Sequence, residues 1–144
     1  MNEKVSQEYV EEFKNGSYQH INLSKTNKKE LSEIIVRKAF KDAISGERYK
    51  GRNESPILRN ADKIKEILLK ELTDKKDEII NNFDNWHNSI CSKTDYGMRY
   101  GVWQKLVNMT FKHMYCVKDF YPEFSGVWDK CHCPLDSNTI ASVF

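Results

Sequence analysis

The segment 26–46, "TNKKELSEIIVRKAFKDAISG", constrains the fold more than any other stretch, because it carries a complete set of helix signals. Asn27 followed three residues later by Glu30 forms the pattern of a capping box at a helix N-terminus. Gly46 follows the last apolar residues and is typical of a helix end. Between the two ends, apolar residues recur at helical spacing: Leu31, Ile34, Ile35 and Phe40. The segment therefore predicts an α-helix.

The rest of the chain shows the same organisation, with helical segments separated by short polar turns. Its 144 residues include only six glycines and three prolines, which favours helices over a turn-rich β-sandwich. A helical region spans about residues 57–90, and Asp74 is expected to cap a second helix within it. Further helices are expected over residues 101–116 and after Asp136. We predict an all-α fold, a compact single-domain bundle of about six helices that comprises residues 1–144.

The charge and the targeting features restrict the class of protein. The net charge is only +2, from 23 basic and 21 acidic residues, so composition alone does not indicate a nucleic-acid partner, although a local basic face stays open. The N-terminal residues include no apolar run suited to a signal peptide, and no segment approaches the roughly 18 apolar residues of a membrane span. We therefore expect a cytoplasmic protein without membrane contact, whose four cysteines are reduced, buried or metal-bound.

The segment 101–116, "GVWQKLVNMTFKHMYC", has an unusual polar stripe on an otherwise apolar helix. On a helical wheel, six residues fall within an arc of about 100°: Gly97, Gly101, Gln104, Lys105, Asn108 and Lys112. The stripe either faces solvent or contacts an anionic or nucleotide ligand. The second interpretation is favoured by the absence of any carboxylate, and by the two glycines, since glycine on an exposed helix costs about 1 kcal/mol relative to alanine.

The histidines and cysteines allow three interpretations. One is a tetrahedral zinc site formed by a His/Cys pair on a helix and two residues of the run 131–133, "CHC". The pair is either His87 with Cys91 or His113 with Cys116, and the leading set is His87, Cys91, Cys131 and His132. Another is plain core packing, because cysteine is among the residue types most often buried. The third is a cysteine nucleophile with a histidine partner.

A polar stretch at residues 47–56, "ERYKGRNESP", carries Arg48, Lys50 and Arg52 close together. Such a run is either a solvated connector between two helices or a loop that contacts phosphates. In the second case, these three residues are the candidate phosphate-binding residues.

Two short stretches, "GVWQKLVN" and "CPLDSNTIASV", resemble the two catalytic motifs of the helix-hairpin-helix DNA glycosylases. In that family, a Gly-hydrophobic-Gly-x-Lys pattern carries a lysine nucleophile, and a later Pro-hydrophobic-Asp-Ser/Thr turn supplies the second catalytic group. Lys105 and Asp136 stand at these positions, whereas Trp103 replaces the second glycine. The spacing is similar to that of the archaeal oxidised-guanine glycosylases, and the resemblance covers about residues 95–144. The tail "CHCPLDS" also resembles uncharacterised proteins of low-GC bacteria.

The resemblance implies a role for each residue of the site. Lys105 would attack the sugar of a damaged nucleotide as the free amine. Its pKa would be lowered either by partial desolvation against Trp103 and Leu106 or by a second cation such as Lys112. Asp136 would hold the amine and stabilise the cationic sugar. Gln104 and Asn108 would contact the extruded base through their amides. One of three aromatic residues would stack on that base: Trp86, Trp103 or Tyr115. His132 is a further candidate ligand-binding residue, with Trp103 and Tyr115.

Two hypotheses of function follow. The first is a small DNA glycosylase or abasic-site lyase that acts on damaged DNA, with a helix-hairpin-helix glycosylase-like fold in its C-terminal half. The alternative is a non-catalytic helical module that binds a nucleotide, nucleic acid or a partner protein. Neither hypothesis requires a cofactor, and zinc is the one candidate metal.

Overall fold

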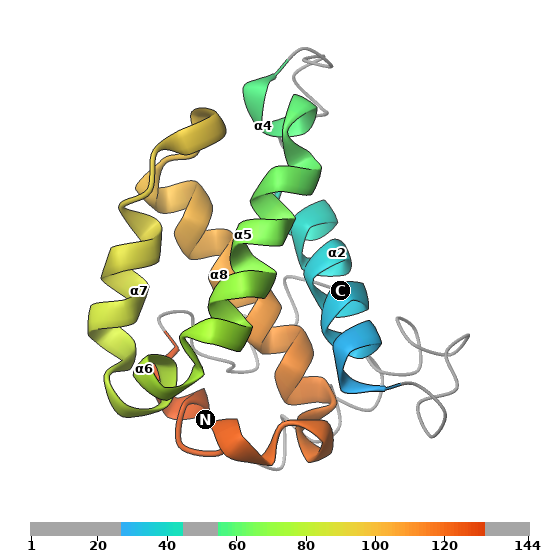
Figure 1. Ribbon diagram of the computed structural model, residues 1–144, viewed down its shortest axis with the longest axis vertical. Helices are drawn as coiled ribbons and strands as arrows, with labels where there is room; N and C mark the ends of the chain where they lie inside the picture. The colour runs from blue at the N-terminus through green and yellow to red at the C-terminus, as the bar shows by residue number, and fades with distance from the viewer. Residues whose placement is uncertain (1–26, 45–54, 132–144) are drawn as a thin grey trace, which may run out of the picture.

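The computed structural model describes residues 27–44 and 55–131, and over these ranges every regular element is a helix (Figure 1). The α-helices are α2 (Lys28–Ala43), α4 (Pro56–Arg59), α5 (Ala61–Asp74), α6 (Lys76–Asn81), α7 (Phe83–Cys91) and α8 (Tyr100–Cys116). Single 3-10 turns are η1 (Asp95–Gly97), η2 (Lys118–Phe120), η3 (Pro122–Phe124) and η4 (Trp128–Lys130). The predicted all-α fold is confirmed. None of the helices in these ranges has the length and apolarity that crossing a bilayer requires.

The cap predicted for the first described helix forms. Asn27 has extended backbone, and its side-chain oxygen accepts a hydrogen bond from the backbone N–H of Glu30 at 2.8 Å. This bond satisfies one of the N–H groups that have no partner within the helix. α2 ends at Ala43, and Ile44 donates its backbone N–H to the Phe40 carbonyl. The predicted stop at Gly46 lies outside the described residues.

The region after residue 56 contains more breaks than the sequence indicated. Instead of two helices, four short helices follow one another, with breaks at Asn60, Lys75 and Asn82. The predicted cap at Asp74 is wrong, because Asp74 is the last residue of α5 and Lys75 occupies the N-cap position of α6. An N-cap residue needs a non-helical backbone, and Asp74 is still part of a helix.

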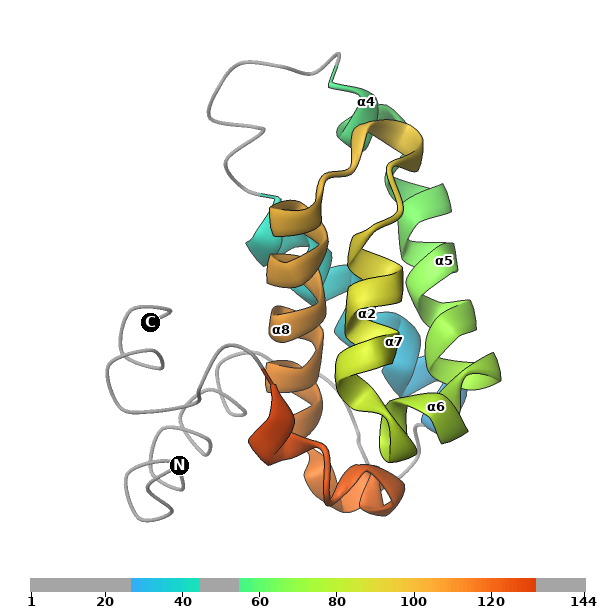
Figure 2. The same cartoon turned by 90° about the vertical axis from the view of Figure 1, so that its left-hand side faces the viewer.

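α8 is the central helix of the bundle and packs against α2 and α7 (Figures 1 and 2). Its second half is buried almost all round, from Thr110 to Cys116. Such a helix needs apolar residues on more than one stripe, which the sequence provides. The buried hydroxyl of Thr110 is satisfied locally, because it donates to the Leu106 carbonyl at 2.8 Å.

Phe111 of α8 is at the centre of an aromatic cluster that joins α7, α8, η3 and η4. Its ring is 1% exposed and meets four other rings in edge or strongly tilted contact: Phe83, Trp86, Phe124 and Trp128. The centroid distances are 5.7, 6.0, 5.8 and 6.3 Å, within the range of favourable aromatic pairs. The cluster holds the C-terminal 3-10 turns against the bundle.

Candidate functional site

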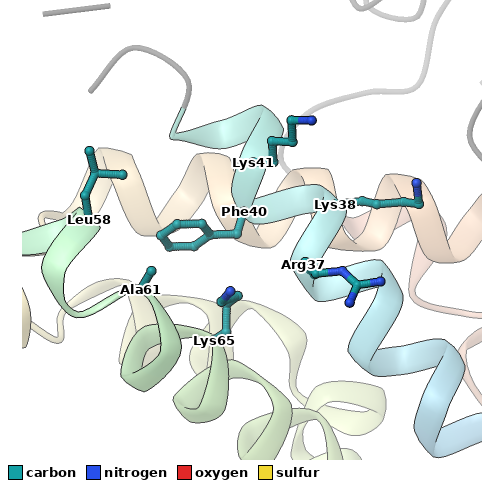
Figure 3. Close-up of a pocket in the computed structure, with 7 residues that line it drawn as sticks. All are labelled: Arg37, Lys38, Phe40, Lys41, Leu58, Ala61 and Lys65. Carbon is teal, nitrogen blue, oxygen red and sulfur yellow. The ribbon is translucent and has the colours of Figure 1, made fainter. Parts of the chain in front are cut away.

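A cationic groove of about 740 Å³ lies between α2 and the start of α5 (Figure 3). The described residues that line it are Arg37, Lys38, Phe40, Lys41, Leu58, Ala61 and Lys65. Four of these seven carry a positive charge, three are apolar, and none is a carboxylate. We call this feature the α2–α5 groove.

The local sequence explains how the groove forms. Arg37 and Lys41 are four residues apart and therefore lie on the same side of α2. Phe40 points towards α4 and α5, and the Lys65 ammonium lies 5.5 Å from the centre of its ring (Figure 3). The break at Asn60 turns the chain between α4 and α5, and the Asn60 amide donates to the Pro56 carbonyl at 2.8 Å. The groove therefore depends on two helices and the turn that precedes the second.

Asp62 of α5 and Asp42 of α2 are not among the described residues that line the groove. Asp62 forms an ion pair with Lys65 at 3.3 Å, but its side chain is fully exposed, so solvent screens the pair. Asp42 of α2 faces His113 of α8, with Oδ2 at 3.1 Å from Nε2. Burial lowers the pKa of His113, and the hydrogen bond to Asp42 only partly opposes this effect. Asp42 therefore bonds to α8 and is not among the described residues that line the groove.

The chemistry of the groove suits an anion with an apolar part. Its volume falls within the roughly 300–1,000 Å³ range of small-molecule sites. Arg37 offers a planar fork that matches phosphate, and the lysines act as point charges. The apolar residues of the groove give a planar or hydrocarbon group a dry contact surface.

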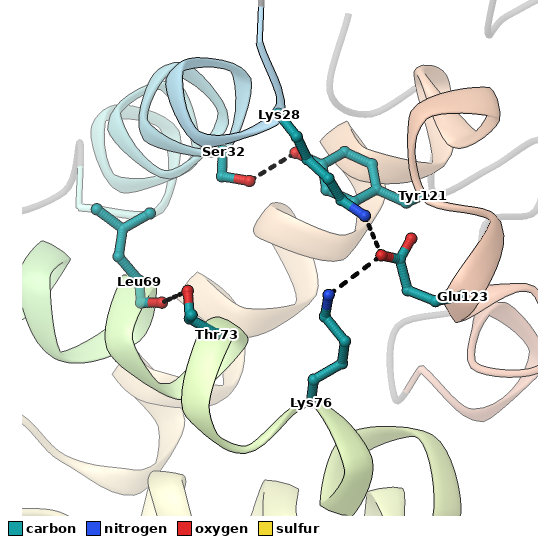
Figure 4. A network of polar contacts seen from close by, with 7 residues as sticks. All are labelled: Lys28, Ser32, Leu69, Thr73, Lys76, Tyr121 and Glu123. Carbon is teal, nitrogen blue, oxygen red and sulfur yellow. Dashed lines mark hydrogen bonds and ion pairs between the residues drawn. The ribbon is translucent and has the colours of Figure 1, made fainter.

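A second groove, of about 670 Å³, lies at the opposite end of α2 and has mixed charge (Figure 4). Its apolar lining comes from Leu69, Leu72, Met114 and Phe124, and its charged lining contains both lysines and carboxylates. An ion-pair cluster adjoins it, where Glu123 Oε2 accepts from Lys28 and Lys76, and the Tyr121 hydroxyl bonds Ser32 at 2.8 Å. This cluster joins α2, α6 and η3, so its first role is structural.

The Glu123 cluster predicts a pH dependence of stability. Burial alone raises the pKa of Glu123, but the hydrogen bonds from Lys28, its own backbone N–H and Lys76 outweigh it, so the pKa lies below its ordinary 4.5. A carboxyl with a lowered folded-state pKa stabilises the fold above its unfolded-state pKa, and this contribution is lost as pH falls. We expect urea midpoints to fall below about pH 4.5, and Glu123→Gln to flatten this acid dependence. An identical acid profile in wild type and variant would contradict the assignment.

The residues of the predicted polar stripe on α8 differ in how far they are exposed. The Lys105 side chain is exposed, Gln104 and Asn108 are half-buried, and Lys112 is only 5% exposed. No described atom lies within 4 Å of a Cβ built on Gly101, so this end of the stripe is open to an approaching molecule. The first turns of α8 are therefore accessible at Gly101 and Lys105, whereas Lys112 belongs to the interior.

Trp103 and Tyr115, two of the aromatic residues predicted as candidates to stack on a base, are parts of the core. Trp103 is 1% exposed, and its indole N–H donates to the Lys93 carbonyl at 2.9 Å. Tyr115 is also buried, edge-on to Trp128 at 5.7 Å, with Lys118 4.7 Å from the centre of its ring. Neither ring presents a free face. The Gly-Val-Trp run of residues 101–103 lies inside the first turn of α8. It is therefore not part of the connection between α7 and α8, which comprises residues 92–99.

Several predicted site residues lie outside the described residues: Arg48, Lys50, Arg52, His132 and Asp136. The contact between Lys105 and Asp136 therefore stays a prediction. The segment that contains Arg48, Lys50 and Arg52 joins Ile44, just beyond α2, to Ser55, just before α4.

Of the predicted zinc ligands, one pair is together. The Cys91 sulfur lies 3.6 Å from His87 Nε2, and both side chains are buried. Across residues 27–44 and 55–131, no group of three or more His, Cys, Asp or Glu side chains could hold a metal ion. Burial raises the pKa of Cys91 to about 11, so it is a neutral thiol near pH 7, which makes it a poor nucleophile.

The residues of the α2–α5 groove were not singled out from the sequence. Arg37, Lys38 and Lys41 read as the polar face of a helix, and Lys65 as an ordinary surface lysine. The one available signal was that three of five residues from position 37 to 41 are cationic.

Comparisons with known proteins add no relatives to this picture. No family model, no curated protein and no solved structure matches the chain.

Proposed function

We propose that the protein is a non-catalytic helical module that binds phosphate-bearing ligands of the nucleic-acid class, and that the α2–α5 groove holds the phosphates. The observation that carries this proposal is the concentration of charge. Arg37, Lys38, Lys41 and Lys65, from two helices, line one groove, and none of the described residues that line it is a carboxylate. Like charges gathered in this way repel each other in the free protein, and a polyanion relieves that repulsion.

The apolar part of the groove favours a nucleotide unit over a bare inorganic anion. Phe40, Leu58 and Ala61 give no hydrogen bonds, and they suit the sugar or base that accompanies a phosphate. The near-neutral chain as a whole does not attract polyanions strongly, so binding is expected to depend on this local cluster.

The direct test is a binding titration by fluorescence anisotropy with three labelled probes. These are an oligothymidylate of about twelve nucleotides, a duplex of similar length and a single nucleotide, each at about 50 mM and 200 mM salt. The proposal expects binding of at least the single strand, with affinity that falls steeply with salt. Absence of binding to all three probes at the lower salt would rule it out.

The enzyme hypothesis is the second candidate, and one observation favours it. The Lys105 amine is exposed on the first turns of α8, next to the open position at Gly101, so a DNA backbone has access to it. In a bifunctional glycosylase the lysine Nζ bonds to the sugar C1′ while the glycosidic bond breaks and the base leaves. The resulting Schiff base is reduced by borohydride to a stable covalent complex.

This candidate predicts covalent trapping. With borohydride, wild-type protein is expected to form a cross-linked band on DNA that contains an abasic or oxidised site, and Lys105→Gln to abolish the band. Lys130→Gln, which removes an exposed lysine of η4, is the matched control and is expected to leave the band unchanged. Asp136→Asn is expected to slow trapping while keeping a helix cap. No band across a panel of damaged bases would exclude lysine chemistry and leave the binding module.

A further inference from the structure

Two tyrosines stand out because their rings are on the surface. Tyr96 is 36% exposed and Tyr100 is 44% exposed, and over the described ranges they are the exposed large hydrophobic residues. By contrast, the rings of Trp86, Trp103 and Phe111 are at most 1% exposed. Tyr96 and Tyr100 lie on η1 and the first turn of α8, four residues apart.

The backbone at Tyr96 is in a conformation that tyrosine disfavours. Its φ of +62° and ψ of 25° are in the left-handed region, where glycine and asparagine are the usual residues. The next residue, Gly97, also has positive φ, and a Cβ there would come within 3.0 Å of the Pro56 Cβ. The turn is therefore held against α4, and a side chain at position 96 has a cost that glycine would not have. A residue with a disfavoured backbone conformation whose side chain is still 36% exposed suggests a role outside folding.

Each ring has a neighbour that restrains it, and the Tyr96 ring lies beside a cation. The Tyr100 hydroxyl donates to Asn88 Oδ1 at 3.3 Å, and its ring is edge-on to His87 at 6.3 Å. The Lys63 ammonium lies 5.5 Å from the centre of the Tyr96 ring. Ordered aromatic rings beside cations are what unpaired bases and their phosphates bind.

The tyrosines and the α2–α5 groove are at the same end of the bundle. α4 contacts η1 and also supplies Leu58 to the groove, and α5 carries both Lys63, at Tyr96, and Lys65, in the groove. Two residues along a helix correspond to about 200°, so Lys63 and Lys65 point to opposite sides of α5. A flexible strand could pass over the start of α5 from one feature to the other.

We propose that Tyr96 and Tyr100 form a stacking platform for the bases of single-stranded nucleic acid, adjacent to the α2–α5 groove that holds its phosphates. The inference rests on the proposed function and specifies its ligand, because bases in a duplex are already stacked on each other and have no free face for a tyrosine. A partner protein is the competing occupant of two exposed tyrosines.

The test uses Tyr96→Gly in the full chain. Because glycine suits positive φ, this variant is expected to keep or raise the melting temperature, although it removes a side chain. Its affinity for oligothymidylate is expected to fall roughly fivefold to a hundredfold, the range for one base–aromatic stack, while its affinity for a duplex of the same length stays unchanged. Tyr96→Asn, which also suits this backbone, is expected to give the same pair of results.

Lys130→Gln, at an exposed position of η4 outside the platform and both grooves, is the control, and its single-strand affinity is expected to stay within about twofold of wild type. Unchanged single-strand affinity in both Tyr96 variants would overturn the platform while leaving the groove intact. Equal loss of single-strand and duplex affinity, or a large drop in melting temperature, would also overturn it, because Tyr96 would then act through the fold. If wild-type protein binds no nucleic acid, the proposed function itself fails, and a partner protein becomes the better occupant.

Discussion

Replacing Arg37 and Lys41 together with glutamine is expected to weaken binding of oligothymidylate by roughly a hundredfold at low salt. A hydrogen bond to a charged group contributes about 1.5–3 kcal/mol net, and each 1.4 kcal/mol is a factor of ten. Two lost phosphate contacts therefore account for at least that change. The effect is measured by fluorescence anisotropy with the full chain. A loss of less than about threefold would contradict the assignment of phosphates to the α2–α5 groove.

The controls for this double variant separate a local effect from net charge. Lys75→Gln with Lys130→Gln removes the same two charges from exposed positions outside both grooves, and is expected to change affinity only slightly. Glutamine is a good helix former, so α2 is expected to remain folded. Lys41 is in the last turn of α2, where a cation contributes about 0.3–1 kcal/mol, so thermal melts of both double variants are recorded alongside.

Phe111→Ala is expected to have the largest effect on the fold itself. Removing a fully buried phenylalanine typically costs about 3–5 kcal/mol, which is a large part of the stability of a domain of this size. Phe111 contacts rings from α7, η3 and η4, so its loss leaves a cavity that several elements would have to move to fill. Urea denaturation is the measurement, and Phe111→Leu is expected to cost clearly less than the alanine variant.

A change below about 1 kcal/mol in Phe111→Ala would show that the aromatic cluster is not the centre of the core. Val102→Ala is a suitable comparison on the same helix, because Val102 is only half-buried and its truncation is expected to cost much less.

The fold class and the first helix could be predicted because their signals are local. The Asn27 cap needs only residues within one turn, and its hydrogen bond forms as the pattern indicates. The sequence predicts a helix break at Asp74, one residue away from the break in the structure. Asp74 is the last residue of α5, and Lys75 lies between α5 and α6. Helix propensity indicates that one helix ends and another begins in this region, but it is less reliable about which residue lies at the break.

The burial of Lys112 shows what a helical wheel omits. Lys112 and Gly101 are eleven residues apart, which returns to nearly the same direction on the wheel. They nevertheless differ in environment, because Gly101 lies at the open end of α8 and Lys112 in its buried second half. A wheel records direction around the axis and contains no information about position along it relative to other elements.

The α2–α5 groove could not be predicted because it exists only where two helices meet. Arg37 and Lys65 are 28 residues apart, and each resembles an ordinary solvated cation when its own helix is considered alone. The sequence instead predicts a ligand-binding stripe on α8, because the lysine and amide residues of that segment are unusual for a single helix. When ordinary residues from separate helices come together in the fold, no local sequence pattern indicates it.

The most direct test of the central claim is the dependence of single-strand affinity on salt concentration, compared between wild type and the Arg37→Gln, Lys41→Gln variant. Each phosphate contact contributes about 0.7 to the slope of log affinity against log salt for a single strand, so the variant is expected to have a slope smaller by about 1.4. The Lys75→Gln, Lys130→Gln control is expected to keep the wild-type slope. Equal slopes for wild type and the groove variant would contradict the claim, because phosphates would then be held elsewhere on the chain.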